Sequence, residues 1–306
     1  MNEKKEPLVS IMTPSFNSYP FIINNIESVK NQDYPNKEHI IIDGGSTDGT
    51  IEVLKNYPHL KWVSEKDNGQ SEAINKGFKL AKGEIIGWLN SDDTYNEGAI
   101  SVSVNEIINN KEIDIVCSDE KVIDEKGETI KILKGEEVTL EKLLFKNVVR
   151  QPTIFMRRKV IETLKGVRED LHYTMDREFW LRVLLSDLKI KYIDGRVLAN
   201  FRYCKGTKSK EMPILFKEEW LKILKELVSY PEIKVKMKKI VERAIKETES
   251  SVLFLKMVKC MREGNSSLAL NNFFRALLRD KRNFFRLGVW KLLLREILIK
   301  TNLIKG

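Results

Sequence analysis

The sequence of 306 residues is poor in the residue types that mark several classes of protein. It holds three cysteines, Cys117, Cys204 and Cys260, whose number and scattered spacing form neither a disulfide framework nor a zinc cluster. With 8 Pro and 16 Gly, it carries no collagen-like or low-complexity signal. This cysteine usage is typical of a protein in a reducing compartment.

Long apolar runs are also missing. The N-terminus reaches a proline and a short strand-like run before any apolar stretch of the length that a signal peptide requires. No window of about 18 residues is free of charge, and the most apolar late stretch, Val289 to Ile299, is interrupted by Lys291, Arg295 and Glu296. We therefore expect a protein that is not secreted and does not span a bilayer.

The chain does have size and an uneven charge. A hydrophobic content of 42% over 306 residues is enough for about two domains with a sizeable core. Residues 196–306 hold 26 Lys and Arg against 11 Asp and Glu, which leaves residues 1–195 with 27 against 33. An acidic N-terminal part that handles an anion needs a metal ion or helix N-termini, whereas a basic C-terminal part favours an acidic surface as partner.

The first hundred residues alternate between strand and helix patterns. Short apolar runs predict strands, and segments with helical spacing between them predict helices. The predicted strands are Leu8–Thr13, Glu38–Asp43, Lys61–Ser64 and Glu84–Leu89, and the predicted helices are Phe21–Asn31, Thr50–Asn56 and Ser71–Ala81. This order is typical of a mostly parallel α/β sheet flanked by helices, whose ligands bind beyond the carboxyl ends of the strands.

The pattern changes after about residue 205. Up to that point the sequence predicts further elements: a helix at 100–110, a strand at 113–117, a hairpin turn at 125–127, a short helix at 139–146, a strand at 153–156 and a helix at 175–185. Beyond it, long amphipathic helices are predicted at roughly 211–229, 232–262, 266–280 and 283–300. We therefore predict two domains, an α/β domain over residues 1–207 and a basic helical region over residues 208–306.

Polar residues gather where the four early strands end. They lie at Thr13–Asn17, Asp43–Gly49, Glu65–Gln70 and Asn90–Asp93. Gly, Asp, Asn and Ser are ordinary turn residues, so each loop taken singly is well explained as a connection. In a doubly wound topology the four loops share one edge of the sheet, and their coincidence favours a single ligand-binding cleft.

Three carboxylates could carry chemistry, and each has a structural alternative. Asp92 and Asp93 repel each other unless a cation or donors compensate, and such oxygen ligands suit Mg²⁺ or Mn²⁺ holding a diphosphate; they also suit a solvated turn. Asp176 opens a predicted helix, either as a general base or as an acid that the helix dipole stabilises. The segment GGSTDG has neither the dinucleotide fingerprint nor the Walker lysine pattern.

Five motifs, in order, make the sequence recognisable. They are VSIMTPSFN, HIIIDGGSTDGT, the segment from EKDNGQS to NSDDTYNEGAI, RQPTIFMRR and DLHYTMDREFWLRV. Over about residues 8–205 the chain resembles family 2 of the inverting glycosyltransferases, which have the Rossmann-like GT-A fold. The resemblance implies a GT-A domain with a C-terminal helical extension. It also implies metal-assisted transfer of a sugar from a nucleotide-diphospho-sugar of UDP, GDP or dTDP type to a hydroxyl, with inversion in a single displacement.

The resemblance also implies a role for each matching residue. The residues that would line the nucleotide-sugar pocket are Thr13, Pro14, Asp43, Asp67, Gly69, Gln70 and Asp92. Asp43 would contact the base and Asp92 would lie by the ribose, while Asp93 would ligate Mg²⁺ or Mn²⁺. Asp176 would be the catalytic base, and Arg150 and Gln151 match the acceptor-side segment.

The sequence departs from the family pattern at two positions. Met175 stands where many relatives carry Glu, which leaves the base in place but removes a neighbouring acid. Cys204 stands where many relatives carry a His that can serve as a further metal ligand. The resemblance then leaves His172 or water to complete the metal site.

The acceptor implied by the resemblance is a growing surface or extracellular glycan, or a lipid-linked saccharide. Residues 283–305 mix aromatic and aliphatic residues with Lys and Arg, which suits either an anionic membrane surface or packing against the preceding helices. We expect a cytoplasmic enzyme of polysaccharide biosynthesis, peripheral on the inner face of the cell membrane. No nucleic-acid-binding module accompanies the basic charge.

Two other functions are alternatives to sugar transfer. A sugar-phosphate nucleotidylyltransferase would carry a Gly-rich N-terminal signature with Arg, which does not follow the first predicted strand. A catalytically inactive scaffold would have no use for Asp43, Asp92, Asp93 and Asp176 together.

Overall fold

The computed structural model describes residues 6–231, 233 and 235–280, and the chain divides into two compact units, residues 1–207 and 208–306. The described part of the first unit holds a nine-stranded sheet in the order β3-β2-β1-β4-β8-β6-β9-β5, with β7 paired to β6. The strands are β1 Val9–Ser15, β2 Lys37–Asp43, β3 Lys61–Ser64, β4 Ile85–Trp88, β5 Thr94–Tyr95, β6 Ile115–Ile123, β7 Thr129–Leu133, β8 Phe155–Arg157 and β9 Ile190–Arg202.

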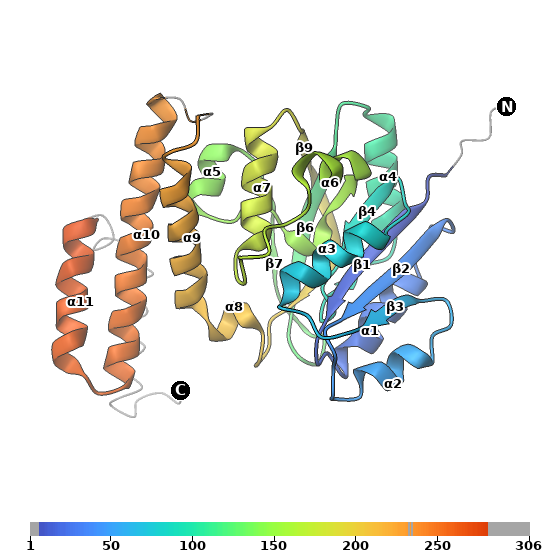
Figure 1. Ribbon diagram of the computed structural model, residues 1–306, viewed down its shortest axis with the longest axis horizontal. Helices are drawn as coiled ribbons and strands as arrows, with labels where there is room; N and C mark the ends of the chain where they lie inside the picture. Colours follow the sequence, from blue (N-terminus) through green and yellow to red (C-terminus); the bar gives the residue numbers. More distant parts are fainter. Residues whose placement is uncertain (1–5, 232, 234, 281–306) are drawn as a thin grey trace. The chain divides into compact units, whose positions relative to one another are not determined.

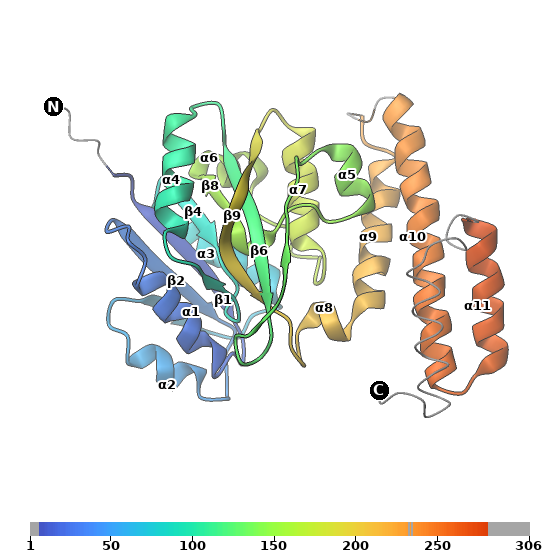
Figure 2. The same cartoon turned by 180° about the vertical axis from the view of Figure 1, so that it is seen from behind.

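Helices flank this sheet on both faces (Figures 1 and 2). They are α1 Phe21–Lys30, α2 Thr50–Lys55, α3 Gln70–Leu80, α4 Ala99–Asn109, α5 Leu140–Phe145, α6 Arg158–Leu164 and α7 Met175–Leu185, with a 3₁₀ turn at Gln151–Thr153. The predicted parallel arrangement is confirmed for β3, β2, β1 and β4. Beyond β4 the sheet is mixed, because β8 runs antiparallel to both β4 and β6.

Alternation along the strands divides the core into two layers. Met12 and Ile42 face α3, where a Cβ on Gly77 would come within 2.1 Å of Met12 Cγ and 3.5 Å of Ile42 Cγ1. The neighbouring residue Ile41 faces the opposite layer, where it packs with Ile26 of α1. Since successive side chains of a strand point to opposite faces, apolar runs such as HIIID are buried on both.

The sequence analysis missed the two-residue strand β5 and the longest strand, β9, which extends over 13 residues. Its burial pattern shows no regular alternation, so the period-of-two signal for a strand is absent. β9 pairs in parallel with β6, and the register shifts between Ser118 and Asp119 and again between Asp119 and Glu120. Such irregularities re-aim side chains, and this one lies beside the candidate site described below.

The described part of the second unit is helical. Its helices are α8 Lys208–Glu211, α9 Pro213–Leu227, α10 Val235–Arg262 and α11 Ser266–Arg279, so three of the predicted long helices are present. Trp220 and Leu224 of α9 are buried, and Ser250 of α10 donates a hydrogen bond to the Ala276 carbonyl of α11 (2.8 Å). The fourth predicted helix, at 283–300, lies outside the described residues. Among the described helices, none is both long and apolar enough to cross a membrane.

Candidate active site

The carboxylate of Asp43 stabilises the loop that follows β2 by accepting hydrogen bonds from it. Its Oδ2 accepts hydrogen bonds from the N–H groups of Gly45 (3.0 Å) and Ser46 (2.9 Å) and from the Ser64 hydroxyl (2.7 Å). Its Oδ1 accepts from the Ser46 hydroxyl. Asp43, which the resemblance assigns to the base, is fully buried, and in this structure its carboxylate shapes the loop.

Asp67 brings the loop after β3 against the loop after β2. Its Oδ1 accepts a hydrogen bond from the Gly69 N–H (2.9 Å), and its Oδ2 would lie 2.9 Å from a Cβ placed on Gly44. Position 44 must therefore lack a side chain for the two loops to meet. Burial raises the pKa of Asp67, the Gly69 N–H lowers it, and the charges of Glu72 and Asp43 raise it further. Asp43 and Asp67 thus lie close together at the ends of neighbouring strands.

Thr13 and Pro14 lie at the end of β1 and are both buried. The Thr13 hydroxyl lies 3.0 Å from Nε2 of the buried His39, so its side chain contacts β2. The next residues are more open: Phe16 is 63% exposed, and the Asn17 N–H donates to the Ser46 hydroxyl (2.7 Å). Phe16 is an exposed aromatic side chain at this edge of the sheet, and the sequence analysis did not single it out.

A chain of amide side chains joins the predicted nucleotide and acceptor sides. Gln70 donates to Oδ1 of Asn90 (3.1 Å), and Asn90 donates to Oε1 of Gln151 (3.0 Å). Gln151 in turn donates to the Trp88 carbonyl (2.8 Å), and Trp88 Nε1 donates back to Asn90 Oδ1 (3.2 Å). The structure therefore brings Gln70 and Gln151 together around Asn90, at the start of the turn that carries Asp92 and Asp93.

Asp92 and Asp93 have different surroundings. Asp93 is fully buried, its Oδ1 accepts from the Arg202 N–H (2.9 Å), and its Oδ2 has no hydrogen-bond partner among the described residues. Burial and the charge of Asp92 raise the pKa of Asp93 well above its ordinary value, and the hydrogen bond from Arg202 opposes them. Asp92 is half-buried. Of the two carboxylates, Asp92 is the one that keeps access to solvent.

The fit of a metal ion rests on this pair. No group of three or more His, Cys, Asp and Glu among the described residues could hold an ion. Cys204 is buried with its Sγ 3.7 Å from the Thr207 hydroxyl, and His172 Nδ1 would lie 3.3 Å from a Cβ on Gly69. The partnerless buried oxygen of Asp93, beside the accessible Asp92, fits a divalent cation that takes its remaining ligands from a diphosphate and water.

Asp176 lies in the first turn of α7. Asn147 donates a hydrogen bond to its Oδ2 (3.1 Å). Burial raises the pKa of Asp176, while the N–H of Arg177 and the Asn147 amide lower it. A carboxylate that is desolvated yet still half-accessible is a stronger base than one in water, as a general base requires.

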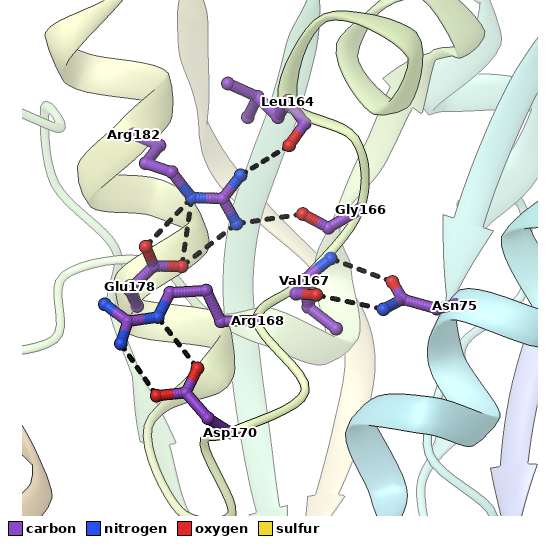
Figure 3. A network of polar contacts seen from close by, with 8 residues as sticks. All are labelled: Asn75, Leu164, Gly166, Val167, Arg168, Asp170, Glu178 and Arg182. Carbon is purple, nitrogen blue, oxygen red and sulfur yellow. Dashed lines mark hydrogen bonds and ion pairs between the residues drawn. The ribbon is translucent and has the colours of Figure 1, made fainter.

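A polar network fixes the segment that leads into α7 (Figure 3). Arg182 donates to the carbonyls of Leu164 (2.6 Å) and Gly166 (2.8 Å) and pairs with Glu178 one turn before it (2.9 Å). Asn75 of α3 donates to the Val167 carbonyl (2.9 Å) and accepts from the Val167 N–H (2.9 Å). The network thus connects the helix of Asp176 with the helix that begins at Gln70.

Glu120 is a buried carboxylate that the sequence analysis missed. It lies on β6 at the register shift, is 5% exposed, and its Oε1 is 3.9 Å from Nη1 of Arg150. Burial raises the pKa of Glu120 to about 7; the charge of Arg150 lowers it, and that of Asp176 raises it. The charge of Glu120 also raises the pKa of Asp93. Arg150, beside Glu120, precedes Gln151, which accepts a hydrogen bond from Asn90 at the start of the turn of Asp93. No local pattern marks Glu120, because it stands in a polar stretch of β6, Ser118–Lys121.

The family assignment follows from a comparison with known proteins. Residues 10–164, about half of the chain, match the model of Glycosyl transferase family 2. The chain belongs to glycosyltransferase family 2. This confirms the resemblance on which the site residues were chosen.

Two relatives of this family 2 member are much longer than it is. The chain is 29% identical to the chondroitin synthase of Escherichia coli over 232 residues, which are 74% of this chain and 33% of the synthase. It is 25% identical to the hyaluronan synthase of Pasteurella multocida over 283 residues, which are 88% of this chain and 29% of that protein. The chain thus spans about a third of the length of these two relatives.

Solved structures show the same fold. A mannosyltransferase from Pyrobaculum calidifontis in complex with GDP-Man and Mn²⁺ superposes with a TM-score of 0.63 at 16% identity, over 99% of this chain and 82% of that one. Residues 1–349 of S. aureus TarS in complex with UDP-GlcNAc superpose with a TM-score of 0.62 at 17% identity, over 90% and 92%. The family 2 member therefore has the GT-A fold that the sequence predicted.

Proposed function

We propose that the protein is an inverting glycosyltransferase of hexosyl type. It transfers one sugar from a nucleotide-diphospho-sugar to a hydroxyl group of a glycan or a lipid-linked saccharide, with the help of a divalent cation. The observation that carries the proposal is that Asn90, at the start of the turn of Asp92 and Asp93, hydrogen-bonds both Gln70 of the predicted nucleotide side and Gln151 of the predicted acceptor side. A cation-binding carboxylate pair and a separate basic carboxylate are the two groups that this reaction needs.

The mechanism assigns one task to each group. Asp176 takes the proton of the acceptor hydroxyl as the oxygen attacks the anomeric carbon from the face opposite the diphosphate, so one bond forms as the other breaks. Asp92 and Asp93 would hold Mg²⁺ or Mn²⁺ through carboxylate oxygens. The bound ion would supply positive charge that stabilises the departing diphosphate. The loops of Asp43 and Asp67 would hold the nucleoside, and Gln70 and Gln151 would orient donor and acceptor around Asn90.

The donor and the acceptor are proposed by class. The solved relatives bound to UDP-GlcNAc, UDP and GDP-Man support a UDP or GDP donor, while a dTDP donor stays a prediction. The chondroitin and hyaluronan synthases among the relatives support a polysaccharide acceptor. Arg150, held 3.9 Å from Glu120, and Gln151 would line the acceptor side.

A membrane surface is proposed as a further partner of the helical unit. Leu270, Phe274 and Leu278 of α11 are spaced four residues apart and are 57%, 55% and 80% exposed, with Arg275 beside them. Side chains at this spacing share one face of a helix. Apolar side chains beside basic ones suit the interface of an anionic membrane. The cytoplasmic location on the inner face of the membrane stays a prediction from the sequence.

A nucleotide screen tests the proposed function. UDP, GDP and dTDP are added with and without Mn²⁺ while the melting temperature is followed, because a ligand of the folded state stabilises it by mass action. We expect one diphosphate to raise the melting temperature only with Mn²⁺, and its sugar conjugates to be transferred or hydrolysed. A scaffold would respond to neither nucleotide nor metal.

The replacement Asp176→Asn separates binding from chemistry. It keeps the shape of the side chain but removes the base, so nucleotide-sugar affinity should stay within a few-fold while transfer falls by about 10² to 10⁴-fold. Single-turnover rates with saturating donor are the measurement. A variant that transfers sugar at the wild-type rate removes Asp176 from this role.

A further inference from the structure

The turn of Asp92 and Asp93 is held through its backbone carbonyls. Asn25 of α1 donates from Nδ2 to the carbonyls of Asn90 (2.8 Å) and Asp93 (3.0 Å). Arg202 at the end of β9 donates from Nε to the carbonyl of Asp92 (3.0 Å). Two side chains, from elements far apart in the sequence, thus capture three carbonyls of the Asn90–Asp93 turn.

Arg202 makes further contacts from the same buried position. Its backbone N–H donates to Asp93 Oδ1 (2.9 Å), and its Nη1 donates to the carbonyls of Asp124 (2.7 Å) and Glu125 (3.2 Å) in the turn between β6 and β7. Its guanidinium carbon lies 4.5 Å from the centroid of the Phe21 ring. The side chain therefore connects the Asn90–Asp93 turn with the β6–β7 turn.

Both side chains that make these contacts are buried, so their polar groups need hydrogen-bond partners within the protein. Arg202 is 1% exposed and Asn25 is 0% exposed. A buried charge destabilises a fold unless it is well hydrogen-bonded, and here the donors of Arg202 are directed at carbonyls and its plane at an aromatic ring. The planar fork of donors allows three carbonyls of two turns to be held at once, which a lysine ammonium cannot reproduce with the same geometry.

We infer that Arg202 and Asn25 are positioning residues for the cation. They would fix three peptide groups of the turn, those that carry the carbonyls of Asn90, Asp92 and Asp93, and so the direction in which the Asp92 carboxylate projects. This inference rests on the proposed function, since it assumes that the turn binds a divalent cation together with a nucleoside diphosphate. It predicts that loosening the carbonyl contacts weakens metal binding even though every carboxylate is still present.

The test measures the Mn²⁺ concentration that half-saturates the binding of UDP or GDP, whichever the wild type binds. In Arg202→Lys the charge is kept but the contacts to several carbonyls are lost, and we expect this concentration to rise about tenfold or more, because each hydrogen bond from a charged group contributes a factor of this order. Asn25→Ser, which cannot reach both carbonyls, should act in the same direction. The EPR spectrum of the bound Mn²⁺ should broaden in both, since the ligand geometry becomes less uniform.

The matched control is Arg158→Lys. Arg158 also donates to two backbone carbonyls, those of Ala81 and Gly83, but on a different part of the chain. Its replacement should change stability while leaving the half-saturating Mn²⁺ concentration within twofold of the wild type. Wild-type Mn²⁺ dependence in both Arg202→Lys and Asn25→Ser would overturn the inference. A wild type whose nucleotide binding ignores Mn²⁺ would overturn the proposed function, and the inference with it.

Discussion

At the scale of single residues, the site is organised around carboxyl groups that are buried to different degrees. Asp92 is partly exposed to solvent, whereas Asp93 is buried and one of its oxygens accepts no hydrogen bond from the described residues. The charge of Asp176 raises the pKa of the buried Glu120. Buried carboxylates of like charge destabilise the ionised form of each other. Their burial is explained if a cation or a proton compensates them during function, and each possibility can be tested separately.

The two aspartates of the turn should respond differently to neutralisation. Asp92→Asn removes the accessible ligand, so Mn²⁺-dependent nucleotide binding should fall by about tenfold or more, while the melting temperature without ligand should change little. Asp93→Asn removes the buried ligand, so it should weaken Mn²⁺-dependent nucleotide binding at least as much, but it also removes a buried like charge and should raise the melting temperature without ligand. Titration of nucleotide binding with Mn²⁺ compares the two. Wild-type Mn²⁺ dependence in Asp93→Asn would show that the ion does not reach the buried oxygen and would remove Asp93 from the metal site.

The raised pKa of Glu120 should make the free energy of unfolding depend on pH. Its pKa is raised to about 7 in the folded protein, against about 4.3 for Glu in an unfolded chain. The folded protein therefore binds this proton more tightly. The resulting stability is fully present below about pH 4 and is lost as the pH rises through about 7. Glu120→Gln imitates the protonated form, so at pH 8 it should be more stable than the wild type, by on the order of 1–3 kcal/mol.

Urea unfolding at pH 5 and pH 8 measures this difference. The gain from Glu120→Gln should be larger at pH 8 than at pH 5. Glu97→Gln, on an exposed turn, is the matched control and should change neither value. A gain of the same size at both pH values would contradict the assigned cause.

At the scale of elements, helix α3 packs closely on the sheet, and this packing positions Gln70 at its first turn. Gly77 allows α3 to approach β1, because a Cβ there would lie 2.1 Å from Met12 Cγ and 2.8 Å from its Sδ. Gly77→Ala should therefore destabilise the protein by about 1–3 kcal/mol, although Ala is the better helix former by about 1 kcal/mol.

Thermal and urea unfolding measure the effect of Gly77→Ala. Lys79→Ala, on the exposed side of the same helix, is the control and should stay within about 0.5 kcal/mol of the wild type. A stabilised Gly77→Ala variant would show that the helix moves away from β1 without cost.

The early strands and helices could be predicted because each carries its own periodicity and turn residues. β9 could not, because its buried and exposed residues do not alternate. Asp92, Asp93 and Asp176 could be proposed as site residues because each lies in a local motif, at a strand end or a helix start, that matches the family. Glu120 and Arg202 do not, because their importance arises where β6 and β9 pair across more than 70 residues of sequence, and no local spacing encodes that contact.

At the scale of the whole molecule, the sign of the charge separates the two units. Residues 208–306 hold 23 Lys and Arg against 11 Asp and Glu, whereas residues 1–207 hold 30 against 33, and α11 presents Leu270, Phe274 and Leu278 on one face. Exposed apolar side chains beside basic ones gain from both the acyl boundary and the anionic headgroups of a membrane. We therefore expect the full chain to bind vesicles that contain an anionic lipid and to release them as salt rises, because salt screens the headgroup charge.

Phe274→Glu tests whether the apolar face of α11 takes part. It removes a large apolar side chain and adds a negative charge, so vesicle binding should fall by more than tenfold. Asn271→Glu adds the same charge next to the face but removes no apolar surface, and it should weaken binding only by the electrostatic part, about 1 kcal/mol. Cosedimentation with vesicles of neutral lipid, with and without anionic lipid, measures both variants. Equal losses in the two would mean that charge alone attracts the helical unit, and unchanged binding in both would assign the membrane contact to another surface.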